Sequence, residues 1–116
     1  MLVVNRFRVE EEAGPAFLAE LRVALEALAG KSGYVDGRIG RNIDDPMLWV
    51  LTTRWENVGS YRRALSSYDV KVRSVPLLSR AVDEPSAYEL VEPGGEARLN
   101  VAVPRTGTAA GPRDAG

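Results

Sequence analysis

The sequence contains neither cysteine nor histidine among its 116 residues. Without cysteine there is no disulfide, no thiolate nucleophile and no zinc or iron–sulfur site built on sulfur. Without histidine the chain lacks both the side chain that titrates near neutral pH and the commonest metal ligand. Ser-His-Asp and Cys-His catalysis are therefore excluded, and we expect no metal site. Any catalysis must use carboxylates, tyrosines, amides, arginines or lysines, or the reactivity of the substrate itself.

An excess of positive charge is also missing. The chain has 15 basic and 16 acidic residues, so general electrostatic attraction to nucleic acid or anionic lipid is not expected. The apolar run at the start ends at Asn5, which is too short for a signal peptide, and no stretch approaches the roughly 20 apolar residues of a membrane span. We therefore expect a cytoplasmic protein with neither nucleic acid nor membrane as a partner.

Hydrophobic periodicity and turn residues predict strands and helices in a definite order. The strands are expected at 2–9, 34–42, 47–55 and 86–91, and the helices at 15–29, 57–65 and 69–75. Side chains alternate along a strand, so Asn5 shares a face with Val3 and Phe7 and is a polar group in an apolar row. The strand at 47–55 is largely apolar on both faces, which is typical of a central strand.

The resulting order, β-α-β-β-α-β, predicts an α+β, ferredoxin-like domain with an antiparallel sheet. In this topology we expect the first and third strands to be central neighbours and parallel to each other. The helices cover one sheet face, whereas Val4, Leu48 and Val50 lie on the other face with too little chain left to bury them. The simplest cover is a second copy packed sheet to sheet, so we predict a homodimer.

The composition changes near residue 92. Residues 93–116 hold five of the 11 glycines and three of the seven prolines, which predicts a domain at 1–92 and a poorly packed C-terminal tail. The alternating segment 97–103 has two interpretations, a short strand added to this or a partner's sheet edge, and simple disorder.

Residues 1–92 resemble the antibiotic-biosynthesis monooxygenase family, whose small members form dimeric α+β barrels. Four features carry the resemblance: the strand LWVLTTRW followed by Glu56, the pair Tyr61-Arg62, the pair Gly33-Tyr34 that opens the second strand, and Tyr88-Glu89 in the last strand. The haem-degrading branch of the family resembles this chain at Asn5, which falls on its catalytic asparagine. Its catalytic tryptophan falls on Ala64 and its iron-binding histidine near Ser74, so haem degradation by that mechanism is not expected.

A second branch oxidises anthrone-like aromatic polyketides to quinones without metal, flavin or any other cofactor. Its tryptophan and tyrosine correspond to Trp55 and Tyr61, whereas its strand-three asparagine falls on Leu51. Asn5, on the adjacent strand, is a candidate for the missing amide. The resemblance thus implies a cofactor-independent monooxygenase whose partners are O2 and a small hydrophobic phenol.

The chemistry suits a chain without histidine, because a deprotonated phenol or enol reduces oxygen directly. The protein must orient the ring, exclude water and stabilise the oxyanion. We predict Asn5 and Tyr61 as catalytic donors, with a substrate-binding set made up of Trp49, Leu51, Trp55 and Arg73. The alternative is a non-catalytic ligand-binding or assembly protein on the same dimeric fold, in which the tryptophans are core residues and Asn5 bonds a neighbouring loop.

Overall fold

The computed structural model describes residues 1–93, and its elements follow the predicted order. The strands are β1 (Leu2–Arg8), β2 (Tyr34–Arg41), β3 (Leu48–Trp55) and β4 (Ala87–Tyr88). The helices are η1 (Glu11–Ala13), α1 (Gly14–Ala29), α2 (Val58–Ser66), α3 (Tyr68–Arg73) and α4 (Val75–Leu78). The α+β, ferredoxin-like fold class is therefore confirmed. Within the described range, no helix has the length and apolar character needed to cross a bilayer.

The four strands form one antiparallel sheet in the order β2-β3-β1-β4. The first and third strands are the central pair, but the prediction that they are parallel is wrong. Helix α1 returns the chain so that β2 runs in the direction of β1, and the turn at 42–47 then reverses β3. Because β3 lies between β1 and β2, it is antiparallel to both of them.

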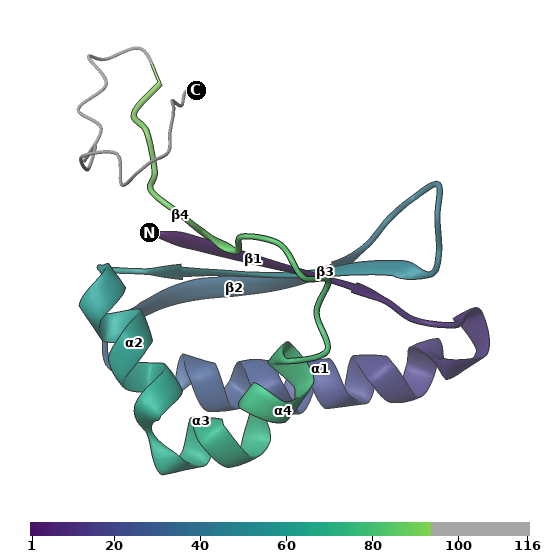
Figure 1. Ribbon diagram of the computed structural model, residues 1–116, viewed down its shortest axis with the longest axis horizontal. Coiled ribbons are helices and arrows are strands. Elements are labelled where there is room, and N and C mark those ends of the chain that lie inside the picture. The colour runs from purple at the N-terminus through teal and green to yellow at the C-terminus, as the bar shows by residue number, and fades with distance from the viewer. Residues whose placement is uncertain (94–116) are drawn as a thin grey trace.

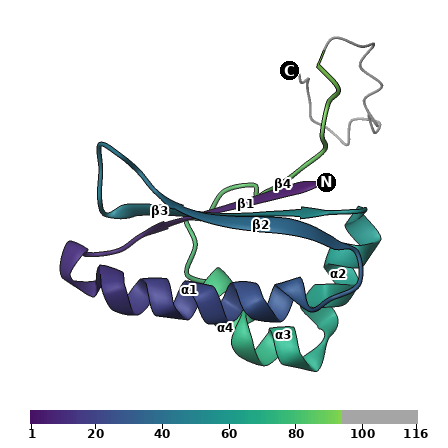
Figure 2. The same ribbon diagram turned by 180° about the vertical axis from the view of Figure 1, so that it is seen from behind.

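All the helices lie on one face of the sheet (Figures 1 and 2). The core forms where α1 packs its apolar stripe, including Phe17, Leu21 and Leu28, against the sheet. The strands contribute alternate residues to this layer, as the strand periodicity predicted. These are Val3 and Phe7 from β1, and Trp49, Leu51, Thr53 and Trp55 from β3, all of them buried.

The helical region after α2 extends further than predicted. Helix α3 ends at Arg73, but a short helix, α4, follows at once and includes Pro76. Proline is tolerated there because the first turn of a helix leaves its backbone N–H groups without intrahelical partners. Ser74 joins this region to α1, since its wholly buried hydroxyl donates a 2.7 Å hydrogen bond to the carbonyl of Ala24.

The last strand is shorter than the predicted 86–91. Its two residues pair with Leu2 and Val3, and the connecting segment 82–86 runs along the same edge of β1. Val82 N–H donates to the Arg6 carbonyl and Val4 N–H donates to the Ser86 carbonyl. The tail predicted at 93–116, apart from its first residue, and the strand predicted at 97–103 lie outside the described residues.

The sheet face opposite the helices carries both apolar and charged side chains. Leu2, Val4, Leu48 and Val50 are half-buried on it, and no helix within residues 1–93 lies over them (Figure 1). Ion pairs lie on the same face, with Arg6, opposite Val50, bound to Glu84 at 2.7 Å and Arg54, opposite Leu2, bound to Asp36 at 2.8 Å. Both carboxyl groups have a lowered pKa, mainly because they accept hydrogen bonds from their arginines.

Gly33 fixes the connection between α1 and β2. It has a φ of +89°, in the left-handed region, and an added Cβ would overlap the side chain of buried Ser60 in the first turn of α2. We predict that Gly33→Ala lowers the free energy of unfolding by about 2 kcal/mol or more, from backbone strain plus the clash. Urea unfolding followed by circular dichroism measures the change.

Gly30 provides the matched control, because its φ is −80° and an added Cβ would make only ordinary contacts. Gly30→Ala should stay within about 1 kcal/mol of the wild type, since a compatible alanine mainly reduces the entropy of the unfolded chain. Equal effects of the two substitutions would contradict this account of Gly33.

Candidate functional site

The space between sheet and helices is divided into two apolar clusters. One is built around Phe7, Phe17, Trp49 and Leu51, and the other around Val3, Leu28, Trp55 and Val70. Polar side chains occur where the clusters meet. They are Asn5, between Val3 and Phe7 on β1, Thr53 on β3, and Ser74 between α3 and α4.

Trp55 is the centre of an aromatic group. Its ring lies 5.5 Å from that of Tyr34, edge-on, and 5.5 Å from that of Tyr61, tilted by 52°. Its indole N–H donates a buried 2.8 Å hydrogen bond to the hydroxyl of Thr53, two residues earlier on the same strand face. Trp55 is only 2% exposed, so its ring is held from several sides.

Tyr61 reaches this group from α2. The helix begins there because Asn57 is a good N-cap, whose side-chain oxygen accepts a 2.8 Å hydrogen bond from the Ser60 N–H. Tyr61 is half-buried, and within residues 1–93 its hydroxyl makes no hydrogen bond. Desolvation raises the pKa of Tyr61 above its ordinary value of 10.0. At neutral pH it is therefore a proton donor in hydrogen bonds and not a general base.

Asn5 lies on the helix-facing row of β1, directly opposite Leu51 of β3. It remains partly exposed, although Val3 and Phe7 on either side of it in the row are buried. In the part of the chain that the structure describes, its amide has no hydrogen-bond partner, so the bond to a neighbouring loop that we considered is not present there. Thr53 and Trp49 are its diagonal neighbours across the strand pair.

Trp49 and Leu51 lie in the cluster away from Tyr61. Trp49 packs edge-on against Phe17 at 5.8 Å, and the Arg41 guanidinium lies over its ring at 5.4 Å from the centroid. The Trp49 indole N–H is buried without a hydrogen-bond partner among the described residues. Both side chains are nearly inaccessible, at 6% exposed for Trp49 and 1% for Leu51.

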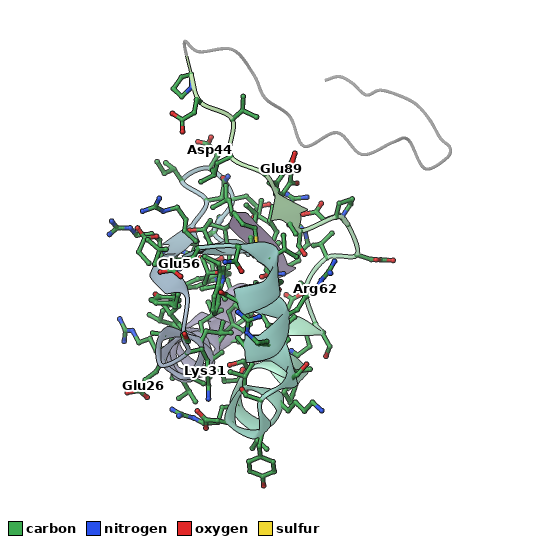
Figure 3. All side chains as sticks on the ribbon, turned by 90° about the vertical axis from the view of Figure 1, so that its left-hand side faces the viewer. Glu26, Lys31, Asp44, Glu56, Arg62 and Glu89 are labelled. Carbon is green, nitrogen blue, oxygen red and sulfur yellow. The ribbon has the colours of Figure 1, made fainter. Side chains whose placement is uncertain are left out.

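Arg73 lies on the outer side of the helix layer. Its guanidinium binds Glu26 of α1 at 2.9 Å and Asp69, one turn earlier, at 3.5 Å. Figure 3 shows Glu26 projecting away from the sheet at the edge of the helix layer. In this arrangement Arg73 links α1 to α3, and its predicted role in substrate binding would require the ion pairs to open. That role stays a prediction.

The structure thus brings Trp55 and Tyr61 into direct contact, and it places Asn5 on the same side of the sheet near the boundary of their cluster. Two residues around Trp55, Thr53 and Tyr34, were not identified from the sequence. Strand periodicity did contain the signal for Thr53, because residues two apart on a strand share a face. The position of Tyr34 depends on the irregular pairing between Tyr34 and Asp36, which no local pattern indicates.

No metal centre emerges from the described residues, among which no three acidic side chains gather closely enough to hold an ion. The position that the haem-degrading branch gives to its iron ligand falls near Ser74. The hydroxyl of Ser74 is wholly buried and already bound to the Ala24 carbonyl. The geometry therefore offers no haem ligand at this position.

The chain belongs to the antibiotic biosynthesis monooxygenase family, whose model matches residues 1–72. No curated protein matches it. Among solved structures, it is similar to SnoaB, a cofactor-independent oxygenase from Streptomyces nogalater, with 21% identity and a TM-score of 0.67. That match covers 82% of this chain and 96% of SnoaB. A conserved protein from Methanosarcina mazei matches with 22% identity and a TM-score of 0.60, over 74% of this chain and 84% of its own.

Burial of Tyr61 has a consequence that can be measured. Because burial raises its pKa, we predict that Tyr61 ionises above pH 10 and later than a solvated tyrosine. Tyr61→Phe should remove a late step from the absorbance titration at alkaline pH. The folded state gains stability from the neutral phenol below about pH 10 and loses this contribution as the pH rises through the pKa of the folded state.

Tyr68, which is 82% exposed, provides the control. Tyr68→Phe should leave the late step of Tyr61 in place. A late step that Tyr61→Phe leaves unchanged in amplitude would contradict the buried environment of Tyr61.

Proposed function

We propose that this protein is a cofactor-independent monooxygenase that oxidises a small hydrophobic phenolic or polyketide-like substrate with O2. One observation carries the proposal. Asn5 and Tyr61 are partly exposed polar groups on the helix-facing side of the sheet, and neither has a side-chain hydrogen bond within residues 1–93. Membership of the monooxygenase family, and the likeness of the fold to that of an oxygenase, support the same proposal.

The position of Asn5 strengthens its assignment. The resemblance places a family asparagine at Leu51, and Asn5 is the residue paired with Leu51 across the two central strands. Directly opposed residues have Cβ atoms roughly 5 Å apart. An amide on β1 therefore reaches nearly the same part of the interior as an amide on β3 would.

The reaction balances without a cofactor. Loss of a proton from an anthrone-like phenol to solvent gives an electron-rich anion, which transfers an electron to O2. Recombination of the two radicals forms a carbon–oxygen bond, and the resulting peroxide loses water to leave a carbonyl group. One oxygen atom enters the product and the other leaves as water, while the substrate carbon is oxidised from CH2 to C=O.

The assigned residues divide this work. Asn5 and Tyr61 donate hydrogen bonds to the oxyanion, which is stabilised most strongly where water is excluded. Trp49, Leu51 and Trp55 provide the apolar surroundings that orient an aromatic ring. Arg73 would add a positive charge that favours the deprotonated substrate, once released from Glu26.

A second function deserves the same test because of one observation, the near-complete burial of Trp49, Leu51 and Trp55. A substrate reaches these side chains only if Tyr61 or a neighbour moves. A filled interior favours a non-catalytic ligand-binding or assembly protein on this fold. The two functions differ in oxygen uptake, which only the enzyme produces.

The prediction for the enzyme concerns Asn5. Asn5→Asp keeps the size of the side chain but removes the N–H donor and adds a charge that repels an oxyanion. We expect oxygen uptake with a panel of anthrone- and naphthol-type phenols to fall about 100-fold, the effect typical of a lost oxyanion donor. An oxygen electrode and metal-free protein suffice for the measurement.

Asn42→Asp is the matched control. The Asn42 side-chain oxygen accepts hydrogen bonds from the backbone N–H groups of Asp44 and Asp45, and aspartate retains that acceptor. Oxygen uptake by the Asn42→Asp variant should stay within about twofold of the wild type. Binding of the phenols without any uptake by the wild-type protein would instead establish the ligand-binding function.

We also propose a homodimer formed through the sheet face opposite the helices. The half-buried side chains Leu2, Val4, Leu48 and Val50 lie on the surface that the helices leave open, and isologous sheet packing would bury them. Arg6 and Arg54 lie on the same face, opposite Val50 and Leu2, and each is paired with a carboxylate that neutralises its charge.

If the dimer forms through this face, a charged side chain introduced there should lower the molecular mass measured in solution. Val50→Lys puts an ammonium group beside Arg6, its cross-strand neighbour, and should shift the protein to monomer in sedimentation equilibrium at micromolar concentration. Val23→Lys, at a 46% exposed position on α1, should leave the mass unchanged. A wild-type protein that sediments as a monomer at all concentrations would disprove the dimer.

A further inference from the structure

The two tryptophans differ in what their N–H groups do. The Trp55 N–H is bound to the Thr53 hydroxyl at 2.8 Å, whereas the Trp49 N–H is buried without a partner among residues 1–93. The two tryptophans therefore differ in whether the indole N–H is already used in a hydrogen bond. Trp55 has no N–H available for a substrate oxygen while the Thr53 bond is made.

Thr53 is itself held firmly. It is 2% exposed, lies between Val3 of β1 and Gly37 of β2, and belongs to the central strand of the sheet. A β-branched side chain on a strand has few rotamers, so its hydroxyl has a nearly fixed position. A buried indole N–H strongly prefers to keep a hydrogen bond, because leaving it unpaired costs about 1–3 kcal/mol.

We propose that Thr53 is a positioning residue, which fixes the ring plane of Trp55 and leaves Tyr61 as the movable member of the aromatic group. Tyr34 supports the ring from β2, where its hydroxyl occupies the space left open by Gly37. Tyr61 has no such restraint, since it is half-buried and its hydroxyl is unbonded within the described residues. A ligand is thus admitted by movement of Tyr61 and then packs on a stationary Trp55.

The role of Thr53 in holding the Trp55 ring does not depend on the proposed function. Only the expected effect of Thr53 on substrate binding rests on that function. The hydrogen bond itself is tested by amide and indole NMR of the intact protein, which has two tryptophans and therefore two indole N–H signals. Thr53→Val removes the acceptor while keeping the shape of the side chain. We expect hydrogen exchange of the Trp55 indole to become about tenfold faster, equivalent to the loss of one hydrogen bond, and Thr53→Ser to restore the slow exchange.

Kinetics test the positioning role. A tilted Trp55 weakens the binding of substrate and transition state alike, so Thr53→Val should raise KM about tenfold and leave kcat within about twofold. Thr53→Ser should recover the wild-type KM. Thr52→Val makes the same change on the opposite face of β3 and should alter neither KM nor indole exchange. An unchanged KM in Thr53→Val would overturn the positioning role.

A double variant covers the case in which Thr53→Val does not fold. Combining it with Trp55→Phe removes both partners of the hydrogen bond, a change that is often nearly neutral for stability. Its KM should equal that of Trp55→Phe alone, because Thr53 acts only through Trp55. A further rise in KM would contradict the proposal. If the wild type binds phenols without consuming oxygen, the proposed enzyme fails, and the dissociation constant replaces KM in the same comparison.

Discussion

The pairing of β1 with β3 determines which side chains of the sheet face the helices and which lie on the open face. Seven consecutive residue pairs, from Leu2 with Arg54 to Arg8 with Leu48, align the two central strands. Since side chains alternate, this register sends Phe7 and Trp55 toward α1 and leaves Arg54 on the open face. A slip by one residue would reverse the faces and put arginine into the apolar layer. The register is therefore fixed by burial as much as by backbone hydrogen bonds.

Much of this arrangement is contained in the sequence. The alternation of apolar residues in 2–9 and 47–55 predicted both faces of the central strands correctly, including the place of Asn5 in the buried row. The prediction that β1 and β3 are parallel was wrong because of how the chain connects them. The crossover through α1 makes β2 run in the direction of β1, and the hairpin that follows makes β3 run in the opposite direction. Helix α4 was missed because the predicted helix at 69–75 ends just before Pro76, although proline also suits the first turn of a new helix.

The candidate site was only partly predictable for a different reason. Sequence patterns assign a residue to a face, but they do not tell which side chain from another element it meets. Arg73 was assigned to a helix correctly, yet its contact with Glu26 depends on how α3 lies against α1. The Trp55–Thr53 bond is local, whereas the contacts of Trp55 with Tyr34 and Tyr61 join three separate elements.

The distribution of satisfied and unsatisfied polar groups links the fold to the proposed chemistry. Thr53 and Ser74 are buried, and both hydroxyl groups are hydrogen-bonded. The Thr53 hydroxyl accepts from the Trp55 indole N–H, and the Ser74 hydroxyl donates to the Ala24 carbonyl, so both stabilise the interior. Asn5 and Tyr61 are partly exposed and keep hydrogen-bonding capacity that no described side chain uses. A chain without histidine lacks the side chain whose ordinary pKa is near neutral, but it can hold neutral donors beside an apolar interior. Such donors suit a reaction in which the substrate supplies the electrons and the protein stabilises the negative charge.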